Sequence, residues 1–581
     1  MSSPATATSA PQRHWVALLF LIAVAAFFLI ANNGAYHGYF LDDEMDNLVN
    51  TGELLPSDFL GGLLLPRYYT NNFRPAGHLF YRLMGDTFEL RFAPYITAIH
   101  VLHLLNVLLL WLILRRLSLP LLGCCAGVLL FAFHMAVFDV YWKPMYVFDL
   151  LCGTFCLLAL LFWMHDGWVF WLLCLLSSWL AFRSKEIAIM FPVALLVYEL
   201  WFGKRRWLKL APFLAISLWF GIQGLIHGSS LHADYSMSFN PVDIWHSAVY
   251  YASKLLVLPH ELPPFQGALV LVGVIAVFLT AAFLVRDRRV LFGLTTFAAM
   301  LVPMLLLSNR LYGAYLYVPL IGVAIAFAAV SARYHLAIPI VFFALWIPWN
   351  YANLRHLRAD ALSQAEDRRR YVATLTELAH QHPEITSFIY EDGPFQLYGT
   401  KAVELWLHPD TQIIMVREEQ PKPQGFLQSP RLAVLYWNNI QRRLEPVVRQ
   451  DRLASYIELG PKAPVWQLGE GWFPLEGNFR WTGPHATAEL DRPENASEFE
   501  LKIIVNTLYL SRVPKGHLRV SINGVRAGDF DLTIDGVFTL RAKLPPGSAG
   551  RTQIAIDADP PYPSEEPKGI AVLAFGFPPK P

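Results

Sequence analysis

The fold of this chain is decided first by residues 15–30, WVALLFLIAVAAFFLI, an apolar run without a charged side chain. An α-helix needs about 20 such residues to cross a hydrocarbon core about 30 Å thick. Similar runs recur through the first part of the chain. We predict eleven spans, at residues 15–31, 92–114, 119–138, 143–164, 168–182, 187–202, 208–226, 267–285, 290–307, 312–330 and 336–352. The sequence therefore predicts a polytopic α-helical membrane protein.

The composition supports this prediction. Hydrophobic residues make up 55% of the chain and charged residues 16%, whereas about a quarter of the residues in a soluble domain are charged. The mean hydropathy is +0.38. The formal net charge is only +1, so charge gives no support for nucleic-acid binding. All five cysteines fall within apolar runs, and no disulfide framework is predicted.

Basic residues in the short loops predict the orientation of the spans, because such residues concentrate on the cytoplasmic side. They fall on one side, in every second loop, if the N-terminus is cytoplasmic. These residues are Arg13, Arg115, Arg116, Lys204, Arg205, Arg206, Arg286, Arg288, Arg289 and Arg333. The loops at 31–91 and 227–266, and everything after about residue 353, then lie on the outer face.

Beyond the transmembrane domain at 1–352, the sequence changes pattern three times. Residues 353–382 place apolar side chains three and four positions apart among arginines, which predicts an amphipathic juxtamembrane helix along the membrane surface. Residues 383–463 combine strand-like runs with a helical pattern near 397–407, which predicts a small α/β module. Residues 464–581 alternate short strands with Gly, Pro and Asn turns, so we predict a β-sandwich, jelly-roll-like domain.

Three aromatic residues stand out in the predicted β-sandwich: Trp472, Phe479 and Trp481. They could form a face on which sugar rings stack. Aromatic side chains usually serve burial, so packing in the core or at a sheet edge is the competing interpretation.

The predicted outer loops and the ends of the spans contain polar residues that a membrane protein seldom carries without a function. The acidic pair Asp42-Asp43 lies about a dozen residues beyond the first span. Later candidates are Arg74, His78, Asp139, Lys143, Lys185, Glu186, Arg310 and Tyr315. Within the second span, His100, His103 and Asn106 lie close to one helix face, where interhelical hydrogen bonds are the expected role.

These segments, in this order, resemble the GT-C superfamily of polytopic glycosyltransferases. The similarity is greatest to the group that depends on polyprenyl- or dolichyl-phosphate-mannose, which includes the tetratricopeptide-containing O-mannosyltransferases and their bacterial relatives. That group has an acidic pair after the first span, as Asp42-Asp43 is here, and then an Arg-Pro segment, as Arg74-Pro75 is. Further similar segments are His134 with Asp139, Ser184-Lys185-Glu186, and Tyr315-Leu316-Tyr317-Val318-Pro319. The resemblance covers about residues 20–335.

The chain also departs from the pattern of that group. Met135 stands where a proline follows the histidine, and Ala314 stands where an arginine precedes the tyrosine. Arg310 could supply the displaced charge. No tetratricopeptide array follows the spans.

The resemblance implies an inverting hexosyltransferase of the bacterial inner membrane, with a cytoplasmic N-terminus and periplasmic C-terminal domains. It would move a sugar from a polyprenyl-phosphate donor to a hydroxyl of an extracytoplasmic protein, lipid or glycan. Asp42 is then the expected base, and Asp43 would orient the acceptor or a divalent cation such as Mg or Mn. Lys185 and Arg310 would stabilise the phosphate leaving group. The substrate site would also contain Arg74, His78, Asp139, Lys143, Glu186 and Tyr315.

The chemistry alone leads to similar requirements. Transfer from a lipid-linked phosphate to a hydroxyl needs a base for the acceptor proton. It also needs cations at the departing phosphate, because negative charge grows on the leaving oxygen in an oxocarbenium-like transition state. A single displacement inverts the anomeric centre.

Two other functions fit the same sequence. A glycan polymerase or ligase would use the same donors and differ in the acceptor. A lipid or sugar transporter would place ionisable residues near the membrane midplane, often with repeat symmetry, whereas here they are predicted at one interface. For single residues, the acidic pair could be solvated or helix-capping, and Lys143, Lys185 and Arg310 could be interfacial side chains. Lys185-Glu186 could be a plain ion pair.

Overall fold

The computed structural model describes residues 10–41, 43–67, 69, 73–227, 236–258, 262–334, 336–391, 412–416, 431–438, 440–564 and 567–578. The chain divides into two compact units. Met1–Glu366 form the helical unit, and Asp367–Pro581 form the β unit.

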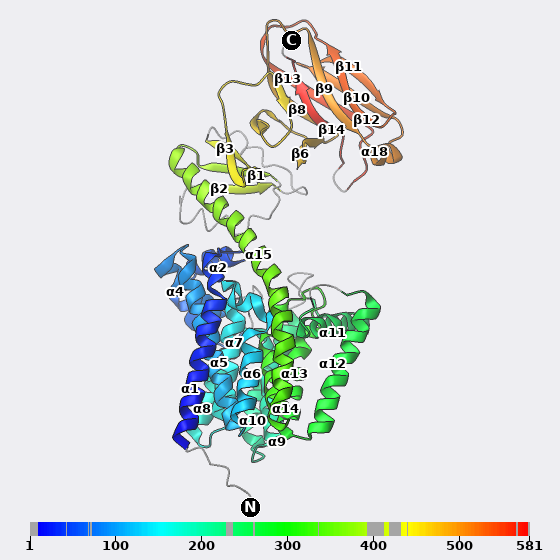
Figure 1. Cartoon of the computed structure of the whole chain (residues 1–581). Coiled ribbons are helices and arrows are strands. Elements are labelled where there is room, and N and C mark those ends of the chain that lie inside the picture. The colour runs from blue at the N-terminus through cyan, green and yellow to red at the C-terminus, as the bar shows by residue number, and fades with distance from the viewer. Residues whose placement is uncertain are drawn as a thin grey trace, which may run out of the picture. The chain divides into compact units, whose positions relative to one another are not determined.

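Long apolar helices build the helical unit (Figure 1). Across the described ranges, six helical segments are long and apolar enough to cross a membrane. They contain α1 (Ala10–Ala31), α5 (Phe92–Arg116), α7 (Val147–Trp163), α12 (Pro264–Val285), α13 (Arg288–Leu305) and α14 (Tyr317–Arg333). A seventh results if α6 (Leu121–Phe133) and η2 (Met135–Tyr141), which meet at 64°, form one span. These six or seven membrane-length helices confirm the prediction of a helical, multi-pass membrane protein, but not the number of spans.

Four further helices coincide with the other predicted spans. They are α8 (Trp168–Ser184), α9 (Phe191–Trp201), α10 (Trp207–His227) and the first part of α15 (Ala337–Gln381). With 11 residues, α9 is shorter than a membrane crossing requires. The number of eleven spans therefore stays a prediction.

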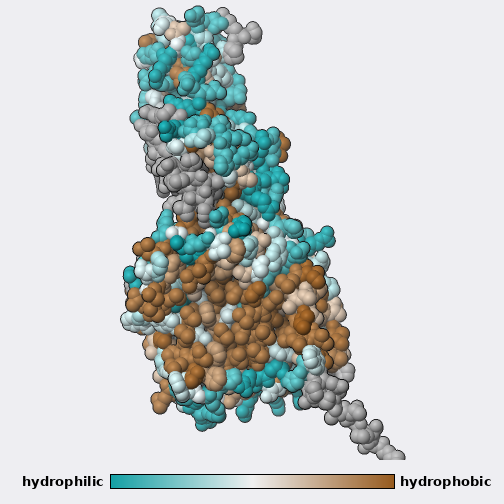
Figure 2. All heavy atoms as spheres, turned by 90° about the vertical axis from the view of Figure 1, so that its left-hand side faces the viewer, coloured by the Kyte–Doolittle hydropathy of each residue, from teal (hydrophilic) through white to brown (hydrophobic). Residues whose placement is uncertain are grey.

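An apolar belt surrounds the helical unit. Figure 2 shows hydrophobic residues covering the sides of the helices, with hydrophilic residues at the end of the unit where the chain begins. Many large side chains in this belt are exposed, among them Leu19, Ile30, Leu208, Phe265 and Leu279. Exposed apolar surface of this extent is what a lipid environment solvates.

Short helices fill the two long loops between the spans. The first loop contains η1 (Asn33–His37), α2 (Glu44–Gly52), α3 (Pro56–Leu64) and α4 (Pro75–Phe88), and the second contains α11 (Pro241–Leu255). Proline at the first helical turn begins α3, α4 and α11, because its fixed φ suits that position and its missing N–H has no partner to lose there. The sequence predicted loops in these regions and missed the helices.

The helix α14 is buried along most of its length, and small residues allow its neighbours to approach closely. A methyl group on Gly293 of α13 would come within 2.5 Å of the carbonyl oxygen of Gly322. On α6, a methyl group on Gly123 would come within 2.5 Å of the carbonyl oxygen of Ala328. Without a hydrophobic driving force between helices in lipid, such close packing is a main source of their association.

A buried polar network joins the spans and confirms the role predicted for the second-span residues. The Tyr317 hydroxyl lies 3.0 Å from His103 Nδ1 and 3.0 Å from Asn106 Nδ2. Asn106 also donates to the Leu150 carbonyl, and His100 Nε2 lies 3.0 Å from the Tyr141 carbonyl oxygen. The network fixes α5, α7 and α14 in register, which positions the segments at their ends.

The structure differs from the prediction at the end of the transmembrane domain. The predicted span at 336–352 and the predicted surface helix at 353–382 belong to one helix, α15, and the boundary between the two units falls inside it. No glycine or proline lies between Pro348 and the end of α15, so nothing in the backbone interrupts it. Pro383 follows two residues later and disfavours further helix.

The first part of the β unit is a four-stranded sheet of order β2-β1-β3-β4. It contains β1 (Ser387–Glu391), β2 (Gln412–Val416), β3 (Leu432–Asn438) and β4 (Arg443–Val448). Strand β1 is parallel to both β2 and β3, whereas β4 runs antiparallel to β3. The strand-like runs predicted at 387–390, 412–416 and 432–436 are confirmed as β1–β3. The helical segment predicted near 397–407 lies outside the described residues.

The rest of the β unit is a two-sheet sandwich around one core. One sheet has the order β11-β10-β13-β8, and the other has the order β12-β9-β14-β7-β6 with β5 beside β14. The strands are β5 (Tyr456–Glu458), β6 (Trp472–Glu476), β7 (Phe479–Thr482), β8 (His485–Arg492), β9 (Glu498–Val505), β10 (Gly516–Ile522), β11 (Val525–Leu532), β12 (Gly536–Lys543), β13 (Gly550–Asp559) and β14 (Ala571–Gly576). Asn523 and Gly524, both with positive φ, turn β10 into β11, as the Asn-Gly sequence predicts.

The three aromatic residues of the sandwich have different surroundings. Trp472 is buried, stacks on Phe575 and donates to the Thr487 carbonyl, so it belongs to the core. Phe479 and Trp481 are half-buried, and Trp481 donates to Glu476. The packing interpretation therefore holds for Trp472.

Candidate active site

The polar residues singled out in the sequence gather at one end of the helical unit. Four segments meet there: the start of α4, the start of α7, the turn between α8 and η4 (Glu186–Met190), and η7 (Gly313–Leu316). Helix α4 contacts both α7 and α8, and η7 packs against η2. Each segment adjoins a different apolar helix, so the fold brings together residues that are far apart in the sequence.

Arg74 and Glu186 form the first contact across this cluster. Arg74 Nε lies 2.8 Å from Glu186 Oε1 and 3.1 Å from Oε2. Arg74 occupies the N-cap position of α4, and its guanidinium lies 5.4 Å from the centre of the Phe148 ring. Burial acts to raise the pKa of the Glu186 carboxyl, but the charge and hydrogen bond of Arg74 outweigh it and hold that pKa below its ordinary value. Glu186 is therefore a carboxylate at neutral pH.

His78 lies one turn after Arg74 and supports the start of α4. Its Nδ1 accepts a hydrogen bond from the Arg74 backbone N–H at 3.0 Å, and its ring packs between Phe73 and Phe148. Burial lowers the pKa of His78 to about 4 from an ordinary 6.5, and the nearby positive charge of Arg74 acts in the same direction. His78 is therefore neutral at pH 7 and fixes the backbone that carries Arg74.

Lys185 forms a buried ion pair with a residue that the sequence did not single out, Asp149. Lys185 Nζ lies 2.5 Å from Asp149 Oδ2, and the two side chains are only 10% and 3% exposed. The same ammonium lies 4.4 Å from the centre of the Tyr315 ring. The one available signal was a single carboxylate inside an apolar run, because an ionisable residue in a span is a functional candidate by default.

The interpretation of Lys185-Glu186 as a plain ion pair is wrong. Lys185 has an extended backbone, with φ −160° and ψ 147°. Successive side chains of extended backbone point to opposite sides. Lys185 consequently reaches Asp149 while Glu186 reaches Arg74.

Arg310 and Tyr315 complete the cluster from the segment before α14. The guanidinium of Arg310 lies 5.6 Å from the centre of the Tyr312 ring, and its charge acts on the Tyr315 hydroxyl. The charges of Asp149 and Arg74 also act on that hydroxyl. Tyr315 therefore has Lys185 over its ring and Arg310 at its hydroxyl.

The acidic loop lies beside this cluster. Asp42 lies outside the described residues, and Asp43 is an exposed residue at the N-cap position of α2, where its side chain makes no capping hydrogen bond. Glu44 is buried and connects the loop to the start of the α7 segment: Oε2 accepts from the Leu41 N–H at 2.5 Å and Oε1 from the Met145 N–H at 3.0 Å. Glu44 therefore ties the start of α2 to Met145, four residues before Asp149.

Asp139 and Lys143 lie on the neighbouring segment η2 and the residues after it. Lys143 Nζ is 3.4 Å from Asp139 Oδ1, and the Asp139 carbonyl accepts from the Lys143 N–H at 2.8 Å. Their segment contacts η7, so they adjoin the cluster around Tyr315.

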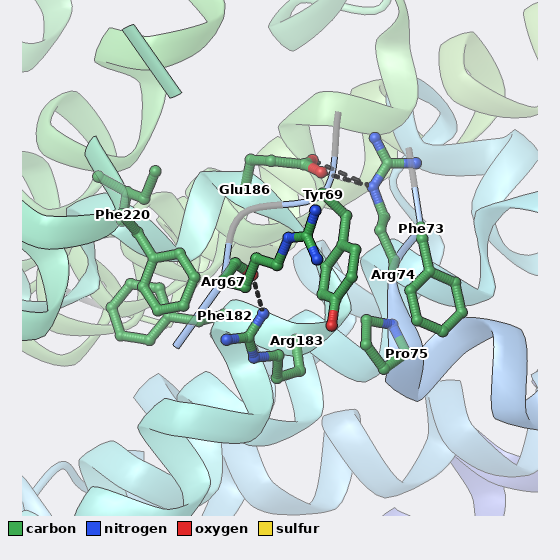
Figure 3. A pocket seen from close by; sticks show the side chains of 10 residues that line it. Arg67, Tyr69, Phe73, Arg74, Pro75, Phe182, Arg183, Glu186 and Phe220 are labelled. Carbon is green, nitrogen blue, oxygen red and sulfur yellow. Dashed lines mark hydrogen bonds and ion pairs between the residues drawn. The ribbon is translucent and has the colours of Figure 1, made fainter. Parts of the chain in front are cut away.

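A hollow opens beside Arg74 and Glu186 (Figure 3). We call it the arginine pocket, and its lining consists of Arg67, Tyr69, Phe73, Arg74, Pro75, Phe182, Arg183, Glu186, Ile189 and Phe220. It contains three guanidinium groups and one carboxylate, and that carboxylate is paired with Arg74. The pocket thus combines an excess of positive charge with aromatic walls, a combination suited to an anion attached to an apolar or sugar group.

Arg183 forms the floor of the arginine pocket and is 3% exposed. Its Nη1 donates to the Arg67 carbonyl at 2.8 Å, its Nη2 donates to the Leu65 carbonyl, and its Nε has no hydrogen-bond partner among the residues that the structure describes. The guanidinium lies 4.7 Å and 4.6 Å from the centres of the Trp179 and Phe220 rings. The sequence did not suggest Arg67, and Arg183 stood out only as part of the polar segment Arg183-Ser184-Lys185-Glu186, because the meeting of the two depends on how the first loop folds back onto α8.

Metal binding finds limited support in this geometry. Over the described ranges, no three His, Cys, Asp or Glu side chains come together as a metal site. Hard divalent cations accept as few as one or two protein carboxylates when the substrate supplies phosphate oxygens.

The chain matches no protein-family model, and no curated protein is significantly similar to it.

Proposed function

We propose that this protein is an inverting membrane glycosyltransferase. It would move a sugar from a polyprenyl-phosphate donor to a hydroxyl of an extracytoplasmic protein, lipid or glycan acceptor. The observation that carries the proposal is the arginine pocket beside an acidic loop, both at one end of a unit built from membrane-length apolar helices. That is the depth at which a lipid-linked phosphate presents its headgroup.

In the proposed reaction, Asp42 removes the proton from the acceptor hydroxyl, and Asp43 orients the acceptor or a divalent cation. The acceptor oxygen forms a bond to the anomeric carbon, and the bond from that carbon to the phosphate oxygen breaks. The electron pair of the broken bond stays on the polyprenyl phosphate. Arginines of the pocket, with Lys185 and Arg310, would stabilise that charge.

The pairing of Lys185 suggests how donor binding could begin. The Lys185 charge is compensated by Asp149, and the Arg74 charge by Glu186. A donor phosphate entering the arginine pocket would compete for these cations and loosen their present pairs. The two carboxylates thus hold the cations in place before the donor arrives, without having to take part in the transfer.

A glycan polymerase or ligase remains the nearest alternative, because it would use the same donor site with a growing glycan as acceptor. A lipid or sugar transporter fits less well. Transport sites lie near the membrane midplane, often on broken helices. The candidate residues described in this chain lie instead at the ends of α7 and α8 and in the turns beside them.

The orientation is part of the proposal: a cytoplasmic N-terminus and a periplasmic β unit in the inner membrane of a bacterium. Ser118 and Ser497 are both exposed, and each can be replaced by cysteine in a chain without its native cysteines. An impermeant thiol reagent applied to spheroplasts should label the cysteine at 497 and not the one at 118. Labelling of the cysteine at 118 would contradict the orientation.

The function itself is tested with purified protein and a synthetic polyprenyl-phosphate sugar. Wild-type protein should bind this donor and either transfer or slowly hydrolyse its sugar. Arg67→Gln should weaken donor binding about tenfold or more, because a charge-assisted hydrogen bond contributes about 1.5–3 kcal/mol. Arg91→Gln is the matched control, since Arg91 is exposed at the start of α5 and lies outside the pocket.

Two outcomes would contradict the proposal. One is that well-folded protein neither binds nor cleaves any polyprenyl-phosphate sugar. The other is that Arg67→Gln and Arg91→Gln bind the donor as well as the wild type. Movement of intact donor across a vesicle membrane without cleavage would favour the transporter.

A further inference from the structure

A second hollow lies at the opposite end of the helical unit from the arginine pocket. It is formed by the turn between α12 and α13, the turn after α5 and the last turn of α14. We call it the basic hollow. Its charged lining consists of Arg286, Asp287, Arg288, Arg289 and Arg333.

The charges of the basic hollow do not cancel. Asp287 is engaged by Arg289, whose Nε lies 3.0 Å from both carboxylate oxygens and whose Nη2 lies 2.6 Å from Oδ2. Burial acts to raise the pKa of Asp287, but Arg289 and the charge of Arg333 hold it below its ordinary value. Asp287 is therefore ionised and offsets one arginine. Arg286, Arg288 and Arg333 leave an excess of three positive charges, and all three are exposed.

The backbone holds these arginines at the rim of the hollow. Arg289 also donates from Nη1 to the Ser118 carbonyl at 3.1 Å, which ties the α12–α13 turn to the turn after α5. Arg286 ends α12 in the left-handed region with φ 49°, so the chain reverses sharply and α13 begins two residues later. The three exposed arginines thus come from a fixed turn and from the end of α14.

The walls below the rim are apolar. They include Pro120, Phe202, Val285, Ala329 and Ala332. These residues belong to the ends of helices or to the turns beside them. A ligand that fills both parts must carry an anionic group at one side and an apolar group at the other.

We propose that the basic hollow is a binding site for the phosphate headgroup of an anionic phospholipid. The position at the end of membrane-length helices sets the phosphate at headgroup depth, and the apolar walls suit the upper part of its acyl chains. Basic pockets between helices at this depth are typical places for such lipids. The proposal does not rest on the proposed glycosyltransferase activity, because it requires only that the helical unit span a membrane.

A soluble phosphate compound could satisfy the charges but would leave the apolar walls exposed. The phospholipid is therefore the one occupant that uses both parts of the lining. The distinction is testable, because glycerol 3-phosphate carries the same anionic group without acyl chains.

The experiment measures lipids retained by the full-length protein after purification in mild detergent, by native mass spectrometry, with phosphatidylglycerol and phosphatidylcholine added in turn. Wild-type protein should retain phosphatidylglycerol and release phosphatidylcholine. The double variant Arg286→Gln/Arg333→Gln should bind phosphatidylglycerol about 30-fold more weakly, since each basic residue near an anionic surface contributes a factor of about five. Arg205→Gln is the matched control: it is exposed at the same end but lies outside the hollow.

Further arms separate the remaining outcomes. Arg286→Lys/Arg333→Lys keeps both charges and should retain most of the phosphatidylglycerol, even if the glutamine pair proves unstable. Excess glycerol 3-phosphate should not displace the lipid. Equal retention of phosphatidylglycerol and phosphatidylcholine, or equal affinity in the wild type and the glutamine pair, would overturn the proposal. Displacement by glycerol 3-phosphate would overturn it in favour of a soluble phosphate ligand.

Discussion

Two buried ion pairs, one at each end of the helical unit, differ in how fully their carboxylates are bonded. At the candidate active site, Asp149 accepts from Lys185 Nζ at 2.5 Å. At the other end, Glu199 accepts from Trp163 Nε1 and from the backbone N, Nε and Nη2 of Arg206, at 2.8–3.0 Å. Both acids are almost completely buried.

The difference indicates which pair is structural and which is available to a ligand. Four hydrogen bonds hold the Glu199 carboxylate, three at Oε1 and one at Oε2, so the Arg206 pair joins α7, α9 and the turn after α9. Asp149 has other cations within electrostatic reach, including Arg74, and its Lys185 partner also faces Tyr315. A buried charge without its partner is costly, but a charge with an alternative partner can exchange. Substitutions at the two ends should therefore separate activity from stability.

The largest expected effect is on the rate of the proposed sugar transfer, at the end that carries the candidate active site. Asp42→Asn should lower the single-turnover transfer rate by about 10²–10⁴-fold, the usual contribution of a positioned general base. Donor binding and the melting temperature should change little, because the base acts on the acceptor proton. Paired measurements of donor affinity and single-turnover rate test this.

Asp43→Asn and Asp139→Asn should be measured in the same way, because they test whether another carboxylate is the base. If Asp42→Asn transfers almost normally while one of these two variants abolishes transfer, the base is a different carboxylate. If none of the three changes the rate, the acidic loop is structural and the proposed function fails.

The second prediction compares the two pairs directly. Glu199→Gln should lower the free energy of unfolding by about 3–5 kcal/mol, because it removes the buried carboxylate that pairs with Arg206 and leaves only the exposed Asp166, 3.6 Å from Nη1. Transfer per folded molecule should stay normal. Lys185→Met should cost less stability, since Arg74 also acts on the Asp149 carboxylate, and should lower donor affinity and transfer. Thermal unfolding and transfer should be measured on the same preparations of both variants. Equal losses of activity in Glu199→Gln and Lys185→Met would contradict the prediction that only the Lys185 pair serves activity.

The third prediction concerns pH and the neutral state of His78. Its pKa is lowered to about 4 in the folded protein, from an ordinary 6.5, so the unfolded chain binds a proton more readily. Above pH 6.5, His78 is neutral in both the folded and the unfolded chain, so its titration does not change the free energy of unfolding. As the pH falls from 6.5 to about 4, stability should decrease by up to about 3 kcal/mol, at 1.36 kcal/mol for each unit of pKa.

The variant His78→Gln tests whether His78 causes this loss of stability in acid. The amide oxygen of Gln can still accept from the Arg74 N–H, but the side chain does not titrate. Its melting temperature should fall less steeply with acid than that of the wild type. His356→Gln, at an exposed position of α15, is the control and should follow the wild type. An unchanged acid dependence in His78→Gln would mean that other groups cause it.

The sequence predicted those features that depend on local pattern. The predicted span at 92–114 corresponds to α5 at Phe92–Arg116, because an unbroken apolar run defines a helix without reference to the rest of the chain. The Asn523-Gly524 turn was predictable for the same reason. The single helix α15 was missed, because a change from apolar to charged residues was taken for the end of a helix although nothing breaks the backbone there.

The candidate site was only partly predictable, since its contacts join distant segments. Arg74, Lys185 and Arg310 could be chosen as polar residues at the ends of spans. Asp149 becomes a candidate site residue only because the fold brings Lys185 Nζ to 2.5 Å from its carboxylate. Arg183 depends in the same way on how the first loop folds over α8. No local pattern contains either contact.

The smallest expected effect is at an ion pair close to the Glu199 site. Lys204 Nζ lies 2.6 Å from Asp166 Oδ2, closer than Arg206 lies to Glu199, yet the two side chains are 72% and 69% exposed. Water already solvates both charges, and salt screens their attraction. Lys204→Met should therefore leave the melting temperature and the transfer rate unchanged at low and at high salt, measured beside Glu199→Gln in the same detergent. A loss of stability as large as that of Glu199→Gln would show that distance, rather than burial and hydrogen bonding of the carboxylate, determines the contribution of an ion pair in this protein.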